Sequence, residues 1–290
     1  MTLTVLAVGA QATVQDLGRP GHAGLGVPVG GAADREALRS ANRAVGNPVD
    51  AAALELLLGG LEVQTDSAAI LAVTGAPSSV WRNAVPVPFG ESFAVRPGDR
   101  VRIGTPVIGL RSYLAVRGGL RAARLYGSAS TNPTADLGPA PLAPGGRWEV
   151  ADSADDEPTL GFSPTSTVHP PQQELTVRVV LGPRDDWFTP QARDRLTASR
   201  WETTAEADRV GIRLAGATLE RARCGELASE GMVRGAIQVP ASGQPIVFGP
   251  DHPTTGGYPV IGVVVDADLD QLWQARPGTG VRFRTVPPPW

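Results

Sequence analysis

Glycine and proline separate short apolar segments along almost the whole chain. The 290 residues include 35 Gly and 27 Pro. Between them lie segments in which apolar and polar residues alternate, or which are apolar throughout, as β-strands do. Because the Gly and Pro residues form turns and not low-complexity runs, they predict a turn-rich, mainly β protein. The expected strands include 2–10, 61–65, 70–74, 111–117, 174–180, 236–239, 245–248 and 260–265.

Helices are expected at only a few places. The clearest begins after Asp34, a good N-cap with Glu36 in the first turn, and ends at Gly46. A second is expected from Thr189 to about Ser199, with proline at its first helical position.

Two features indicate a bipartite chain. A polar, proline-rich stretch is expected to be a linker, and similar Arg-Pro-Gly units occur at 95–103 and 275–283. These similar units favour a duplication of two β halves. A third partial copy at 143–150 leaves open the alternative that the same type of turn produced similar sequences independently. The expected parts are an N-terminal half at 1–154, a linker at 155–171 and a C-terminal half at 172–290.

The composition excludes several kinds of chemistry. All 26 basic residues are Arg, so the chain has no Lys for a Walker-A loop, a Schiff base or covalently attached biotin. A net charge of −3 without a basic cluster argues against nucleic-acid binding. No apolar run is long enough to span a membrane, and one Cys forbids an internal disulfide. We therefore expect a cytoplasmic protein.

No metal site is expected. His22, His169 and His252 lie far apart in the sequence and lack the paired spacing of zinc ligands. Cys224 has no base near it in the sequence, so a plain buried or half-buried thiol is favoured over a nucleophile.

Polar residues beside Gly and Pro are the N-terminal candidates for a site. Asp16 and Arg19 lie three apart on a turn, where they either pair with each other or face a ligand together. Asn42 falls on the buried face of the first helix, so its amide either ties down a loop or reaches into a site. Glu55, within the apolar segment 54–58, raises the same question of what its polar side chain binds. The simpler interpretation is that Glu55 is exposed on an edge strand. The glycine-rich loop 27–34 leads into a helix N-terminus, a place that binds anions, but Asp34 already occupies the cap.

The densest polar cluster lies at 229–258. Short expected strands alternate there with turns, and Gly256 and Gly257 let the backbone approach a ligand closely. Uncharged hydroxyl and amide groups of this kind suit a small polar amide or carboxylate, although turn chemistry also explains part of the pattern. We expect Asp251, Tyr258 and Glu230 to be catalytic, and Asp16, Arg19, Asn42, Gln238, Gln244, Thr254, Thr255, Gly256 and Gly257 to bind substrate.

Ordered motifs along nearly the full length resemble one family. They are found at 14–21, 26–28, 31–34, 45–48, 53–55, 229–231, 235–240, 243–246 and 254–259. The family is the biotin-dependent carboxyltransferases, also called allophanate hydrolase subunit 2. It includes the C-type component of ATP-dependent 5-oxoprolinase, the antagonist of a sporulation kinase inhibitor, and the carboxyltransferase part of urea carboxylase.

The resemblance implies two cyclophilin-like β-barrel domains and a tight partner, the subunit 1 or B-type protein. In the 5-oxoprolinase interpretation a third, A-type protein completes an enzyme that uses ATP, bound with or by another subunit, to open 5-oxoproline to glutamate. The alternatives are a carboxyltransferase component that takes CO₂ from biotin on another protein, and a non-catalytic regulatory partner of subunit 1.

Two departures from the family pattern matter. Members commonly have Gly-Ser-Arg-Ser-Thr-Asp where this chain has 127–132 with Ala129 and Asn132, so an Arg and a carboxylate are absent together. The Lys that often follows Gly-Gly-Tyr-Pro is Val260 here. If the absent Arg and Asp bind substrate in relatives, this chain acts on something else or serves as a scaffold.

Overall fold

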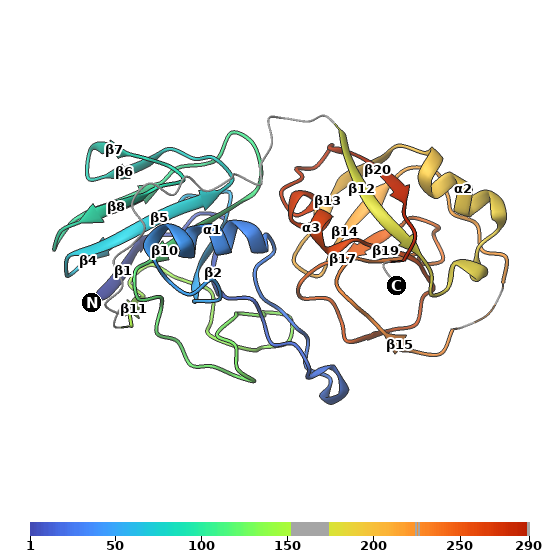
Figure 1. The fold of residues 1–290 in the computed structure, drawn as a ribbon, viewed down its shortest axis with the longest axis horizontal. Helices are drawn as coiled ribbons and strands as arrows, with labels where there is room; N and C mark the ends of the chain where they lie inside the picture. Colours follow the sequence, from blue (N-terminus) through green and yellow to red (C-terminus); the bar gives the residue numbers. More distant parts are fainter. Residues whose placement is uncertain (152–173, 224, 226, 289–290) are drawn as a thin grey trace. The chain divides into compact units, whose positions relative to one another are not determined.

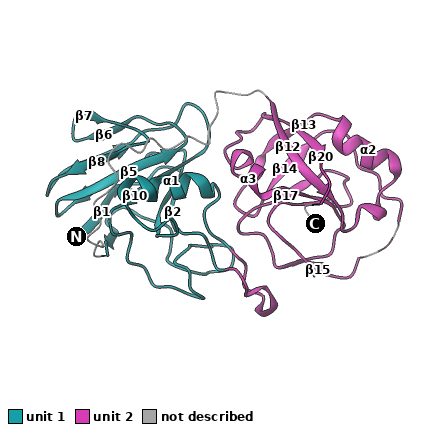
Figure 2. Cartoon of the chain, viewed as in Figure 1, with its two compact units in different colours: residues 1–19, 30–170 teal, residues 20–29, 171–290 magenta. Residues whose placement is uncertain are grey.

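The computed structural model describes residues 1–151, 174–223, 225 and 227–288 (Figure 1). The expected linker at 155–171, His169 and Cys224 lie outside the described residues. The chain forms two compact units (Figure 2): unit 1 is Met1–Arg19 with Gly30–Pro170, and unit 2 is Pro20–Val29 with Pro171–Trp290. Residues 20–29, which fall in the expected N-terminal half, thus belong to unit 2, and the expected boundaries stay a prediction.

Unit 1 contains two antiparallel sheets. The six-stranded sheet has the order β11-β1-β4-β9-β6-β7 and the five-stranded sheet the order β2-β3-β10-β5-β8. The first sheet consists of β1 Thr2–Ala7, β4 Glu62–Thr65, β6 Val80–Arg82, β7 Val85–Val87, β9 Arg100–Ile103 and β11 Arg147–Glu149. The second consists of β2 Gln11–Gln15, β3 Ala53–Leu57, β5 Ala69–Gly75, β8 Ser92–Val95 and β10 Arg111–Val116.

The two sheets of unit 1 enclose one apolar core. Leu3 and Val63 of the first sheet share this core with Leu54, Leu71 and Leu114 of the second. Buried positions alternate along β1 and β4, as expected for a sheet with one buried face. Strand β10 is buried at every position because both faces of its sheet are covered.

Helix α1, Arg35–Val45, covers the second face of the five-stranded sheet. It begins after Asp34, whose carboxylate accepts a hydrogen bond from Ala37 N at 2.9 Å, and it ends before Gly46, which has φ 75°. Its apolar side chains pack against Tyr113 and against alanines of β5 and β10. The helix predicted from the capping residues is confirmed.

Unit 2 is a closed barrel of seven strands in the order β12-β19-β16-β17-β14-β13-β20. The first and last strands, β12 and β20, pair in parallel and complete the closure. The strands are β12 Glu174–Leu181, β13 Trp201–Ala207, β14 Gly211–Ala215, β16 Ala236–Gln238, β17 Ile246–Phe248, β19 Val260–Val264 and β20 Gly280–Thr285, and a separate ladder joins β15 Glu230–Gly231 to β18 Thr255–Gly256.

Two helices pack on this barrel. Helix α2, Pro190–Ala198, contacts β20 and confirms the second predicted helix. Helix α3, Asp266–Leu272, contacts β12 and was not predicted. It is short, acidic and lacks a side-chain N-cap, so no start signal marks it in the sequence. Its anchor is Asp268, which accepts hydrogen bonds from the main-chain N–H and the guanidinium of Arg178.

The Pro-Gly segments 96–99, 143–146 and 276–279 form the same turn. In each, the N–H of the fourth residue donates to the carbonyl of the first at 3.0 Å, as in Asp99 to Arg96, Thr279 to Arg276 and Gly146 to Ala143. The glycine has a positive φ, 85° at Gly98 and 88° at Gly278, as a type II turn requires. Two of the three copies lie in unit 1 and one lies in unit 2, and duplication of the two halves stays a prediction.

The mainly β fold expected from the sequence is confirmed. The expected strands coincide with β1, β4, β5, β10, β12, β16, β17 and β19 within a few residues at their ends. Among the described residues, no helix is both long and apolar enough to cross a membrane.

Candidate functional site

A cavity of about 630 Å³ lies over the outer face of the unit 2 barrel. Its floor is a row of three residues on neighbouring strands: Arg213 of β14 pairs with Ile246 of β17, which pairs with Gln238 of β16. Directly paired residues of antiparallel strands place their side chains on the same face, and all three line the cavity. An arginine, an apolar side chain and a carboxamide therefore share one space.

The turn between β13 and β14 forms the charged wall of this cavity. Glu206 and Asp208 line it. Asp208 is held by its own turn, since its Oδ1 accepts from the N–H groups of Val210 and Gly211 at 2.8 and 3.1 Å. Glu206 pairs with the Arg213 guanidinium at 3.0 Å. Glu206 and Asp208 against Arg213 leave the lining with an excess of negative charge.

The Gln238 amide has a defined orientation. Its Nε2 donates to the main-chain oxygen of Tyr258 at 3.1 Å, and the residue is only 6% exposed. A Cβ on Gly256 would lie 2.7 Å from that Nε2, so only glycine fits there without displacing the amide. With Nε2 engaged, Oε1 is the free hydrogen-bonding end of a side chain that lines the cavity.

The segment 251–258 packs along the same outer face. Thr255 and Gly256 form β18, which pairs with Glu230 and Gly231, while Thr254 accepts from Met232 N at 2.9 Å. Met232 belongs to an apolar cluster with Ala236, Phe248 and Val260. Phe248 and Pro253 also line the cavity, so this segment borders it. Gly257 is exposed, and a Cβ there would meet only the carbonyl of Leu227, at 3.6 Å.

The three residues expected to be catalytic have different surroundings. The Glu230 carboxylate pairs with the guanidinium of Arg184, whose Nε lies 2.8 Å from Oε1. Asp251 is a buried partner of Arg209. Tyr258 is 48% exposed, and its ring centroid lies 5.6 Å from the guanidinium carbon of Arg221. Of the three, Tyr258 is the most open to solvent.

His252 is a buried residue of the segment 251–258. Its Nδ1 lies 2.7 Å from the carbonyl oxygen of Pro253, which fixes Nδ1 as the protonated nitrogen of the neutral ring. Its ring stacks on Phe248 with 6.1 Å between centroids. Burial lowers the pKa of His252 below its ordinary value, against the opposing effects of the Pro253 carbonyl and of Asp251.

Gln244 lies outside the cavity lining. Its side-chain amide forms a pair of hydrogen bonds with Gly216, accepting from the main-chain N–H at 3.1 Å and donating to the carbonyl at 3.3 Å. These bonds join the turn before β17 to the end of β14.

Asp16 and Arg19 belong to unit 1, where both bind the segment 124–130. Asp16 accepts from the hydroxyls of Ser128 and Ser130 at 2.6 and 2.5 Å and from Ala129 N at 2.7 Å. Arg19 donates to the Ser130 carbonyl. Both residues are at most 2% exposed.

Asn42 ties down a loop in unit 1. Its Nδ2 donates to the Ala51 carbonyl at 2.8 Å, and its Oδ1 accepts from Asn47 at 3.1 Å. These bonds correspond to the first of the two roles considered from the sequence, and a role of Asn42 in substrate binding stays a prediction. They hold the connection between α1 and β3.

The interpretation of Glu55 as an exposed edge residue is wrong. Strand β3 lies between β2 and β10, and Glu55 is 4% exposed. Its Oε2 accepts from the hydroxyl of Tyr113 at 2.7 Å and from Ala33 N at 2.9 Å. Burial, and next the Glu55 charge, raise the pKa of Tyr113 well above its ordinary value, so the hydroxyl stays a donor. The glycine-rich loop 27–34 thus binds the protein's own carboxylate.

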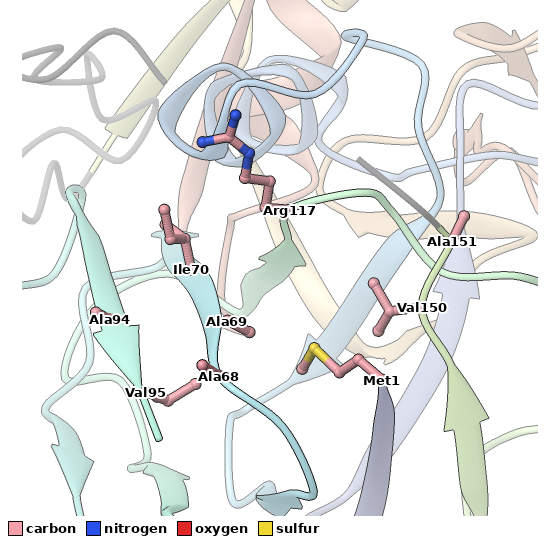
Figure 3. Close-up of a pocket in the computed structure, with 9 residues that line it drawn as sticks. All are labelled: Met1, Ala68, Ala69, Ile70, Ala94, Val95, Arg117, Val150 and Ala151. Carbon is pink, nitrogen blue, oxygen red and sulfur yellow. The ribbon is translucent and has the colours of Figure 1, made fainter. Parts of the chain in front are cut away.

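A second cavity, of about 450 Å³, lies in unit 1 (Figure 3). Its labelled side chains are apolar except for Arg117, and include Met1, Ile70 and Val150. It contains none of the residues expected to bind substrate. The unit 2 cavity is therefore the better candidate for a small polar ligand.

Comparisons with known proteins identify the family. The sequence model of the carboxyltransferase domain, subdomain A and B, matches residues 25–285. The chain belongs to this carboxyltransferase family. The C-type component of 5-oxoprolinase from Escherichia coli strain K12 is 35% identical over 287 residues, covering 97% of this chain and 90% of that protein. Its counterpart from Haemophilus influenzae is 33% identical, covering 98% and 91%.

Larger proteins contain a similar region. Urea amidolyase of Lachancea kluyveri is 30% identical over 96% of this chain, which spans only 16% of that protein. The crystal structure of Kluyveromyces lactis urea carboxylase superposes with a TM-score of 0.91 at 28% identity, covering 99% of this chain and 27% of that one. This carboxyltransferase fold therefore occurs both in a protein of similar length and inside larger enzymes.

The departures from the carboxyltransferase family pattern occupy buried positions. Ala129 is 1% exposed within the loop bound by Asp16, and the Asn132 Oδ1 accepts from Ala135 N at 3.0 Å. Val260 packs in the apolar cluster under the cavity.

Sequence reasoning missed three charged residues of the unit 2 cavity, namely Glu206, Asp208 and Arg213. A signal was present, because charged residues flank a Gly-containing turn at 206–211. Arg184 and Arg209, the partners of two expected catalytic residues, carried no local signal. Among the described residues, no group of His, Cys, Asp or Glu is arranged to hold a metal ion.

Proposed function

We propose that this chain is the C-type subunit of a heteromeric, ATP-dependent 5-oxoprolinase that opens 5-oxoproline to glutamate. The observation that carries the proposal is the similarity to the C-type components of two bacterial 5-oxoprolinases over nearly the whole of both chains. The partners we propose are a subunit 1 or B-type protein and an A-type protein. One Cys fits the reducing cytoplasm, where we place the assembly.

The chemistry explains why ATP is needed. A lactam carbonyl is weakly electrophilic because of amide resonance. In our proposal its oxygen attacks the γ-phosphorus of ATP, and ADP leaves. Water then adds to the activated carbon and the ring C–N bond breaks, with the nitrogen taking a proton, to give an acyl phosphate. A second water releases phosphate and glutamate.

We propose that ATP is bound with or by another subunit. This chain has no Lys, so only arginine guanidinium groups and main-chain N–H groups are available here to hold phosphate. We assign the catalytic roles to Asp251, Tyr258 and Glu230, of which Tyr258 is the most accessible. The substrate-binding roles stay with the polar residues around the unit 2 cavity and with Asp16, Arg19 and Asn42 as further candidates.

A carboxyltransferase role is the second candidate. It is favoured by the fold shared with urea carboxylase. The carboxylated biotin would be carried by another protein, because this chain has no Lys to which biotin could be attached. A third candidate, a non-catalytic regulatory partner of subunit 1, is favoured by the uncharged residues at 129 and 132.

One reconstitution distinguishes these candidates. The chain is co-purified with its subunit 1 mate and the A-type protein, and glutamate release from 5-oxoproline is measured with and without ATP. ATP-dependent release that needs all three proteins is the expected result. Carboxylation of urea with a biotinylated carrier and bicarbonate supports the second candidate instead. A tight two-chain complex without either activity supports the third.

A further inference from the structure

The floor of the unit 2 cavity contains a guanidinium group and a carboxamide group, which can bind different parts of one ligand. Arg213 and Gln238 flank Ile246 from the two neighbouring strands. Their main chains are therefore about 10 Å apart, two strand spacings. The Arg and Gln side chains are long enough to reach toward each other over Ile246, so one small molecule can touch both.

Gln238 offers an acceptor. Because Nε2 donates to the Tyr258 carbonyl, the amide cannot rotate without losing that bond. No hydrogen bond to Oε1 is formed by the described part of the chain, and the residue is 94% buried, since 6% of it is exposed. Because Gln238 lines the cavity, its Oε1 can accept a hydrogen bond from an N–H donor of a ligand. A carbonyl or carboxylate placed at the same point would be repelled.

The guanidinium group of Arg213 is a cation that can bind a ligand carboxylate. Its partner in the fold is Glu206 at 3.0 Å, and the two side chains are 53% and 75% exposed. Ion pairs this exposed contribute little to stability. A ligand carboxylate can therefore replace Glu206 at low cost and form the two parallel hydrogen bonds that a guanidinium allows.

We propose that this cavity binds a small cyclic amide that carries a carboxylate next to its ring N–H. The ring N–H donates to Gln238 Oε1, the carboxylate accepts from Arg213, and the ring methylenes rest on Ile246 and Phe248. This inference rests on the proposed function, because 5-oxoproline has this arrangement of groups. It makes Gln238 and Arg213 the residues that determine specificity, and assigns them no bond-breaking step.

The first test uses the unaltered full chain, alone and in complex with its subunit 1 mate. Titration calorimetry compares 5-oxoproline with its N-methyl derivative, which lacks the N–H, and with 2-pyrrolidinone, which lacks the carboxylate. Each change is expected to weaken binding about tenfold or more, the effect of one lost hydrogen bond to a buried or charged partner. Equal affinities for all three lactams, or binding of none, would overturn the proposal.

The second test uses two variants and two matched controls. Gln238→Met should weaken 5-oxoproline binding about tenfold and abolish the preference over the N-methyl derivative. Arg213→Met should weaken 5-oxoproline binding without affecting 2-pyrrolidinone. The controls are Gln64→Met, at a half-buried strand glutamine bonded to a carbonyl, and Arg282→Met, at an exposed strand arginine paired with Glu174.

The outcomes separate this inference from the proposed function. If Gln238 has only a structural role, Gln238→Met should weaken the binding of all three lactams equally. The preference for 5-oxoproline over its N-methyl derivative would then remain, and this result would refute the specificity role. If the melting temperature shows that a variant does not fold, the calorimetry of the three lactams with the unaltered chain tests the proposal. Turnover by the complete assembly with unchanged KM in both variants refutes the inference alone. Selective binding without turnover refutes the proposed function alone.

Discussion

Arg209 holds the carboxylate of Asp251 through two hydrogen bonds, from Nε to Oδ2 at 2.7 Å and from Nη2 to Oδ1 at 3.0 Å. The side chains are 7% and 1% exposed. A residue expected from the sequence to be catalytic is thus half of a buried ion pair. Its substitution affects folding as well as any chemistry.

Asp251→Ala should lower the free energy of unfolding by about 3–5 kcal/mol, because it leaves the Arg209 charge buried without its partner. Urea unfolding followed by circular dichroism measures this. The double variant Arg209→Met/Asp251→Leu, which replaces both charges by apolar groups, should recover most of the loss. Equal stability of Asp251→Ala and the unaltered chain would contradict the assignment.

Tyr258→Phe should separate catalysis from stability. The ring is half exposed, so removing its hydroxyl should change the free energy of unfolding by no more than about 0.5 kcal/mol. If the hydroxyl transfers a proton in the reaction, kcat of the reconstituted assembly falls about 100-fold or more. Tyr126→Phe, at an exposed tyrosine of unit 1, is the control. Normal turnover by Tyr258→Phe would remove this residue from the catalytic set.

Tyr113→Phe should destabilise unit 1 by about 1–3 kcal/mol, because two buried hydrogen bonds are lost. The hydroxyl accepts from Asp34 N at 2.8 Å and donates to Glu55 at 2.7 Å, so it joins the start of α1 to β3. Hydrogen exchange should accelerate at the first amides of α1. Unchanged exchange there would show that the helix start does not depend on this hydroxyl.

Asp268→Asn should make the stability of unit 2 less dependent on pH. Burial opposes ionisation of Asp268, but the side-chain and main-chain hydrogen bonds from Arg178 outweigh it and lower the pKa of the carboxyl below 3.8. A lowered carboxyl pKa stabilises the fold above the unfolded value and loses that effect as pH falls through the folded value.

The Asp268→Asn variant should therefore be about 1–2 kcal/mol less stable than the unaltered chain at pH 7. The difference should shrink below about pH 4, near the ordinary pKa of Asp. Melting temperatures measured from pH 7 to pH 3 test this. Asp194→Asn, at an exposed aspartate of α2, should show no such trend. A constant difference across the range would refute the role of the charge.

The candidate site was only partly visible in the sequence. Gln238 and the glycines at 256 and 257 were recognised from their polar and glycine-rich context, and the structure places Gln238 in the cavity lining. Arg213 was not predicted, because nothing near it in the sequence links it to Gln238. The two become neighbours only through their common partner Ile246 on β17.

Local patterns determined helix α1 and the Pro-Gly turns of this protein, since capping and turn formation act within a few residues. Asp34 and Gly46 bounded α1, and each Pro-Gly pair formed its turn. The environment of a polar side chain depends on strands distant in sequence. The tertiary structure alone decided that Glu55 is buried against Tyr113 and that Asp251 is bound to Arg209, because burial and long-range pairing follow from sheet order.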